Sequence, residues 1–133
     1  MSRAILCLSD DRAAEHSLRL ALANTSPDWS VEFVASRDEF MSHPKPTLIL
    51  LDLMLARESA VDVLRWLRTD PRYRDVPVFV LGSETIQHLV NEAYALGADS
   101  CLVREAFDEG FEPLAQGLAT YASLLSPRVC APC

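Results

Sequence analysis

The sequence has 133 residues and a formal net charge of −7, with half of its residues hydrophobic and 23% charged. This length suits one domain, since domains most often have roughly 100–150 residues, and the composition is that of an ordinary globular protein. The negative charge would repel a phosphate backbone, so we expect no binding to nucleic acid. The apolar runs are far shorter than the roughly 20 residues of a membrane helix, so we expect a cytoplasmic protein that does not enter membranes.

Strand and helix patterns alternate from the start of the chain. Residues 4–8 form a continuous apolar run that predicts a strand buried on both faces. In residues 13–24 the apolar positions recur at steps of three and four, which predicts a helix. A strand over 31–35 is followed by the capping box of Ser36 and Glu39, which predicts a short helix that ends before Pro44.

The same alternation continues in the second half. Residues 47–51 give the most hydrophobic strand pattern, and Ser59 is predicted to open the helix that follows. A strand over 76–81 precedes a helix over 84–96 that Gly97 ends. The last predicted elements are a strand over 100–103 and a helix over 113–125.

Five buried strands that alternate with five helices predict a mostly parallel sheet with helices on both faces, because parallel neighbours need helical crossovers. The commonest solution at this length is the flavodoxin-like fold, three α/β/α layers with strand order 2-1-3-4-5. We expect the domain to occupy residues 1–126 and a flexible tail to occupy 127–133. Ligands of such sheets bind beyond the carboxyl ends of the central strands. The polar residues expected there are Ser9, Asp10, Asp11 and Asp52.

Two of these carboxylates end adjacent central strands and would form a compact acidic pocket. We expect Asp10 and Asp52 to be this pair, with a hard divalent cation such as Mg²⁺ relieving their repulsion. Beside the cation, one carboxylate could attack a phosphoryl group and form an acyl phosphate. Asp52 is the candidate nucleophile because it ends the most apolar strand. The alternative is that both are ordinary solvated residues at strand ends.

Over about residues 3–125 the chain resembles the receiver domains of response regulators. Four landmarks in the correct order carry the resemblance: residues 4–11 (AILCLSDD), 50–53 (LLDL), 76–81 (VPVFVL) and 97–99 (GAD). The resemblance implies a CheY-like signalling module rather than an enzyme, with Asp52 as the phosphoacceptor and a histidine kinase as the donor. It also implies Asp10 as the main Mg²⁺ ligand, the backbone carbonyl of Met54 as a further ligand, and Asp11 as an additional candidate. Residues 65–78 and 111–125 are similar to small receivers that partner phytochrome-type histidine kinases.

Several positions depart from the family pattern. Ser9 stands where the family has an acidic residue, and Gly82 stands where it has the hydroxyl residue that binds the phosphoryl oxygen. Ser83 replaces that hydroxyl only if the strand end shifts or bulges. Arg104 takes the place of the phosphate-binding Lys, and Cys101 the place of the aromatic that moves with the hydroxyl. We therefore expect either signalling without phosphorylation or a weak conformational response to it.

Two other functions stay open. The chain could be a degenerate receiver that serves as a phosphorylation-independent interaction or dimerisation module, or a flavodoxin-like enzyme or redox protein that uses Cys130 and Cys133. One C-x-x-C pair supplies only two of the four ligands of a structural zinc site, and Cys7 and Cys101 are expected to be buried in strands.

Three large apolar side chains lie at or beyond the margins of their helices' apolar faces: Tyr94, Tyr121 and Leu124. They favour a homodimer contact through residues 84–96, 100–103 and 113–125, or through 113–125 alone. The sequence names neither the kinase nor the target.

Overall fold

The computed structural model describes residues 3–10, 15, 16, 19, 20, 23, 29–55, 58–82 and 87–103. They contain the strands β1 (Arg3–Leu8), β2 (Trp29–Val34), β3 (Leu48–Asp52), β4 (Val78–Gly82) and β5 (Ser100–Val103). The helices are α2 (Arg37–Ser42), α3 (Ala60–Thr69) and α4 (Gln87–Ala95). The five described residues of the predicted first helix are helical. The predicted helix over 113–125 and the tail over 127–133 lie outside the described residues.

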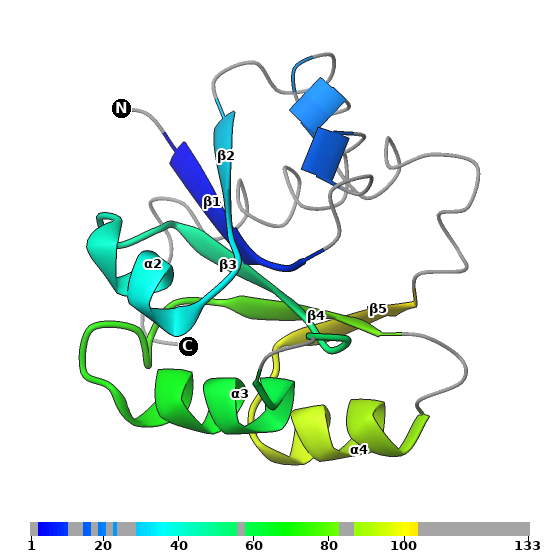
Figure 1. Cartoon of the computed structure of the whole chain (residues 1–133). Coiled ribbons are helices and arrows are strands. Elements are labelled where there is room, and N and C mark those ends of the chain that lie inside the picture. Colours follow the sequence, from blue (N-terminus) through cyan, green and yellow to red (C-terminus); the bar gives the residue numbers. More distant parts are fainter. Residues whose placement is uncertain are drawn as a thin grey trace.

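The five strands form one parallel sheet in the order β2-β1-β3-β4-β5, which confirms the predicted topology (Figure 1). β1 and β3 are neighbours, and Leu8 pairs with Leu51 near their carboxyl ends. Every residue of β3 and of β4 is buried, as expected for strands that helices cover on both faces.

The main core lies between one face of the sheet and the helices α2, α3 and α4. Figure 1 shows α3 and α4 side by side along this face. The cluster includes the strand residues Leu6, Leu8, Ile49, Leu51, Val78 and Val80 with the helix residues Phe40, Val63, Leu64, Leu67 and Ala93. Alternate strand residues, which point to the other face, are buried as well: Ile5, Cys7, Leu48, Leu50, Phe79 and Leu81. Within the described part of the chain, no helix is long and apolar enough to cross a membrane.

Two predicted helix starts are confirmed at the level of single hydrogen bonds. The Ser36 hydroxyl accepts the Glu39 N–H of α2 at 3.2 Å, and the Ser59 hydroxyl accepts the Asp62 N–H of α3 at 3.3 Å. The Glu39 carboxylate reaches back to the Ala35 N–H at 3.3 Å, one residue before the expected Ser36 N–H. Both caps satisfy backbone donors that an isolated helix end leaves free.

Gly97 ends α4 as predicted. Its φ of 102° lies in the left-handed region that glycine adopts without strain. The Ala98 N–H donates to the Ala93 carbonyl at 3.0 Å, and the Gly97 N–H donates to the Tyr94 carbonyl at 3.1 Å. This pair of bonds is the Schellman motif, which closes the helix and turns the chain into β5.

The ends of β1 and β3 differ from prediction by at most one residue, and those of β2 and β4 by up to two. β2 begins at Trp29 rather than at residue 31, because its first residue pairs with Arg3 at the start of β1. β4 spans Val78–Gly82 rather than 76–81. Pro77 has no N–H for the ladder, although its carbonyl still accepts the Ile49 N–H at 2.9 Å.

The Arg68 side chain, near the end of α3, holds two loops at the amino-terminal edge of the sheet. It donates to three carbonyl oxygens over 3.0–3.1 Å, those of Arg74, Val76 and Gly97. It also forms an ion pair with the Asp99 carboxylate at 2.7 Å. The same Asp99 oxygen accepts the Val78 N–H at 2.8 Å. One side chain thereby fixes the segments that enter β4 and β5.

We expect Arg68→Ala to lower the free energy of unfolding by about 2–4 kcal/mol, because it removes several hydrogen bonds and leaves the Asp99 carboxylate without its cation. Urea unfolding followed by circular dichroism measures the loss. Arg65→Ala is the matched control on the same helix. Arg65 also pairs with a carboxylate, that of Asp62 at 3.0 Å, but the two side chains are 57% and 62% exposed. The control should therefore cost less than about 1 kcal/mol, and equal losses in the two variants would contradict the role of Arg68.

Candidate functional site

The candidate site lies where β1 and β3 end side by side. The pairing of Leu8 with Leu51 continues one step further and brings Ser9 next to Asp52. Asp52 is only 3% exposed and Ser9 8%, and they are the two buried polar residues among those described. A buried carboxylate is costly unless hydrogen-bond donors satisfy its oxygens. The surroundings of Asp52 must therefore supply donors.

Two hydrogen bonds from described residues help to hold the Asp52 carboxylate. Its Oδ2 accepts the Ser9 hydroxyl at 2.8 Å, and its Oδ1 accepts the Met54 backbone N–H at 2.8 Å. Leu53, which lies between Asp52 and Met54, donates its N–H to the Leu81 carbonyl at 3.0 Å. This bond attaches the turn to β4. The carboxylate is thus oriented by the end of one strand and by the turn that follows its own strand.

Two of the predicted cation ligands, Asp10 and Asp52, lie at the carboxyl ends of the neighbouring strands β1 and β3. Asp10 follows Ser9 and is exposed, in contrast to the buried Asp52. Within the described ranges, no three His, Cys, Asp or Glu side chains are grouped so that they could hold a metal ion. Mg²⁺ commonly uses only one or two carboxylates and keeps several waters, so two carboxylates with the Met54 carbonyl fit its donor chemistry. Asp11 lies outside the described residues.

The end of β4 lies beside Asp52, because Asp52 pairs with Leu81. Gly82 is the next residue and the last of β4, and it pairs with Val103 of β5. A glycine brings no hydroxyl to this point of the site. Ser83 and Arg104, the other predicted contributors, lie outside the described residues, and their roles stay predictions.

The chain is similar in sequence to two response regulators. No family model matches the chain. The chain is 23% identical over 129 residues to response regulator Rcp1 of Synechocystis sp. (strain ATCC 27184 / PCC 6803 / Kazusa), and the match covers 90% of this chain and 88% of Rcp1. It is 25% identical over 116 residues to response regulator Rre1 of the same organism, and that match covers 85% of this chain and 50% of Rre1. The chain thus spans half the length of Rre1.

Solved structures show the same fold. The phosphorylated cyanobacterial phytochrome response regulator RcpA superposes with a TM-score of 0.81 at 23% identity, over 92% of this chain and 95% of RcpA. The Mn²⁺-bound form of Rcp1 superposes with a TM-score of 0.78 at 22% identity, over 90% of this chain and 93% of Rcp1. The chain has the fold of receiver domains and is similar in sequence to response regulators. The resemblance expected from its four landmarks is confirmed.

In this chain the loop after Asp52 is anchored to α2 by Glu58. The Glu58 carboxylate accepts the Arg37 backbone N–H at 3.2 Å and the Arg37 Nε at 3.1 Å. The Arg37 guanidinium also lies over the Trp66 ring, 5.3 Å from its centroid. Trp66 in turn packs edge-to-face on Phe40 at 5.8 Å. Sequence patterns missed this anchor because Arg37 and Glu58 belong to different elements, 21 residues apart.

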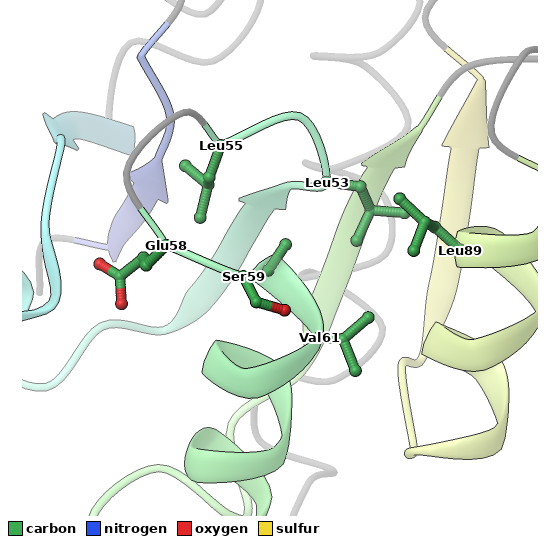
Figure 2. A pocket seen from close by; sticks show the side chains of 7 residues that line it. Leu53, Leu55, Glu58, Ser59, Val61 and Leu89 are labelled. Atoms are coloured by element: carbon green, nitrogen blue, oxygen red, sulfur yellow. The ribbon is translucent and has the colours of Figure 1, made fainter.

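A mostly apolar pocket of about 210 Å³ adjoins the Asp52 turn of the receiver. Its lining comes from the β3–α3 loop, the start of α3 and α4: Leu53, Leu55, Glu58, Ser59, Ala60, Val61 and Leu89. Figure 2 shows Leu53 and Leu89 pointing toward each other, whereas the Glu58 carboxylate points away from them. The pocket offers little polar chemistry, so the reactive group of this region is Asp52 and not the pocket.

Cys101, which the resemblance places where receivers have an aromatic residue, was predicted to be buried but is only partly buried in β5. Its backbone N–H donates to the Tyr94 hydroxyl at 2.9 Å, and its side chain packs against the main core. Burial raises the pKa of the Cys101 thiol above its ordinary value. The protonated, unreactive form is therefore favoured near neutral pH. Cys7 is fully buried, as predicted.

The raised pKa of Cys101 predicts slow alkylation. At pH 8.5 Cys101 should react with iodoacetamide several-fold more slowly in the folded chain than in urea, because less of it is thiolate and its sulfur is less accessible. Peptide mapping by mass spectrometry gives the rate at this residue. In the folded chain, the rate of Cys101 alkylation should still increase with pH at values where the rate in urea no longer changes. Equal rates and equal pH profiles in the two states would contradict the prediction.

Proposed function

We propose that this receiver accepts a phosphoryl group on Asp52 from the phosphohistidine of a histidine kinase, with Mg²⁺ held by Asp10, Asp52 and the Met54 carbonyl. The observation that carries the proposal is the buried Asp52 carboxylate, which two donors orient at the carboxyl edge of a central strand. A nucleophile whose orientation is fixed before the reaction loses little entropy on the way to the transition state. The proposal supports a signalling role in a two-component pathway.

The transfer exchanges one bond for another. An Asp52 oxygen forms a bond to phosphorus while the bond from phosphorus to the imidazole nitrogen of the donor breaks. The imidazole leaves with that electron pair, and Asp52 becomes an acyl phosphate. Bound Mg²⁺ would supply positive charge that neutralises the phosphoryl oxygens. The Met54 N–H keeps Oδ1 of Asp52 in place while the transfer proceeds.

The partners belong to the same proposal. Similarity to Rcp1 and to the phytochrome response regulator RcpA supports a phytochrome-type kinase. A homodimer contact across α4 and β5 is supported by the Tyr94 side chain, which is 51% exposed. Tyr121 and Leu124, the other residues of the expected contact, lie outside the described residues. A cytoplasmic location and the lack of nucleic-acid binding are also part of what we propose.

Phosphorylation is tested with a small phosphodonor. We expect the chain with acetyl phosphate and Mg²⁺ to gain the mass of one phosphoryl group, measured by intact mass spectrometry. Asp52→Asn should gain none, because the amide nitrogen and oxygen are poor nucleophiles. Removal of Mg²⁺ with EDTA should slow the gain at least about a hundredfold, since the charge of the phosphoryl group is then uncompensated. An unmodified parent chain, or equal labelling of Asp52→Asn, would refute the proposal.

The response to phosphorylation should be weak. Residue 82 brings no hydroxyl to the end of β4, and Cys101 brings no aromatic ring to β5, so two contacts that could differ between the two states are missing. We expect beryllofluoride with Mg²⁺ to shift amide NMR signals near Asp52 while β4, α4 and β5 shift little. Asp52→Asn, which should not bind beryllofluoride, gives the baseline. Large shifts throughout β4, α4 and β5 would exclude a weak switch.

A further inference from the structure

The Ser9–Asp52 hydrogen bond gives Ser9 a part in the chemistry, on condition that the proposed function is correct. The Ser9 hydroxyl lies 2.8 Å from Oδ2 of Asp52, and both residues are buried. The Ser9 backbone is itself fixed, since its N–H donates to the Val34 carbonyl of β2 at 3.0 Å. The hydroxyl is therefore presented to Asp52 from a backbone that two strands hold in place.

The Ser9 and Met54 hydrogen bonds to Asp52 differ in how easily each can be broken. The Met54 N–H is part of the backbone, so it cannot leave Oδ1 unless the turn rearranges. The Ser9 O–H rotates about one single bond, so it can leave Oδ2 while every heavy atom stays in place. Loss of the Ser9 bond therefore needs no movement of heavy atoms, whereas loss of the Met54 bond requires the turn to rearrange.

The charge of residue 9 matters as much as its hydroxyl. Serine is neutral, and it satisfies a buried oxygen of Asp52 without adding a charge. A carboxylate at the same position would repel Asp52 when no cation is present and would attract a divalent cation strongly. Residue 9 therefore affects both the cation-free orientation of Asp52 and the affinity of the site for the cation.

We propose that Ser9 is a positioning residue for the phosphoryl transfer. Its hydroxyl holds the Asp52 carboxylate in the orientation from which an Asp52 oxygen attacks phosphorus. Its neutrality keeps the affinity for the divalent cation low.

Three substitutions in the full chain separate these roles: Ser9→Ala removes the donor, Ser9→Thr keeps it, and Ser9→Asp adds a charge. Each variant is checked for folding by circular dichroism. Mg²⁺ affinity is measured by calorimetric titration, and the phosphorylation rate is measured with acetyl phosphate at saturating Mg²⁺. The amide NMR signal of Met54 reports the orientation of Asp52 without any phosphodonor, because this N–H donates to Oδ1.

For Ser9→Ala we expect a loss of about tenfold in phosphorylation rate at saturating Mg²⁺, the effect of one hydrogen bond to a charged group. The Met54 amide signal should shift, and the Mg²⁺ affinity should stay within about threefold of the parent, because no charge has changed. Ser9→Thr should restore the rate to within about threefold, because it keeps the hydroxyl. Ser9→Asp should bind Mg²⁺ at least about tenfold more tightly and should melt at a lower temperature until Mg²⁺ is added.

The positioning role is overturned if Ser9→Ala keeps the parent rate and the parent Met54 signal, or if Ser9→Thr fails to rescue while folded. The charge role is overturned if Ser9→Asp binds Mg²⁺ no more tightly than the parent. If the parent chain itself accepts no phosphoryl group, the proposed function fails. In that case the Met54 signal and the Mg²⁺ titrations still decide whether Ser9 orients Asp52 and sets the cation affinity.

Discussion

The Asp52 carboxylate is buried, and a buried carboxylate is stable only when hydrogen-bond donors satisfy its oxygens. One donor, the Met54 N–H, is local and comes with the turn. The other, the Ser9 hydroxyl, exists only if β1 and β3 are parallel neighbours in the register that pairs Leu8 with Leu51. A slip of one residue would point Ser9 to the opposite face of the sheet. The stability of the site and the pairing of the two central strands therefore depend on each other.

Helix α3 runs from the carboxyl-terminal edge of the sheet to its amino-terminal edge. Near its start, Glu58 ties the loop after Asp52 to Arg37 of α2. Near its end, Arg68 ties the loops before β4 and β5 to the same helix. The ten residues Ala60–Thr69 between these anchors are regular helix with a well-buried face. Side-chain hydrogen bonds thus attach neighbouring loops close to both ends of α3, one of them the loop after Asp52.

Local signals in the sequence were sufficient for the fold. Strand runs, the caps at Ser36 and Ser59, and the glycine at 97 each depend on neighbours within a few residues. The caps and the glycine were confirmed, and all five strands were found, four of them with shifted ends. The site was predicted only in outline. The bond from Ser9 to Asp52 joins residues 43 apart and depends on a register known to one residue, which hydrophobic patterns do not provide. The resemblance alone indicated that Ser9 removes a negative charge from the site, whereas the structure shows that Ser9 donates a hydrogen bond to Asp52.

Tyr94 links α4 to β5 in a way that bears on switching. Its hydroxyl accepts the Cys101 N–H at 2.9 Å, on a strand that forms the edge of the sheet. Cys101 itself brings no aromatic ring to β5, but an aromatic side chain from α4 reaches its backbone. Any shift of α4 that withdrew Tyr94 would cost about 1 kcal/mol for the lost hydrogen bond and would expose a donor on an edge strand. A small stimulus would therefore tend to move α4 and β5 together, as one body, and not to separate them.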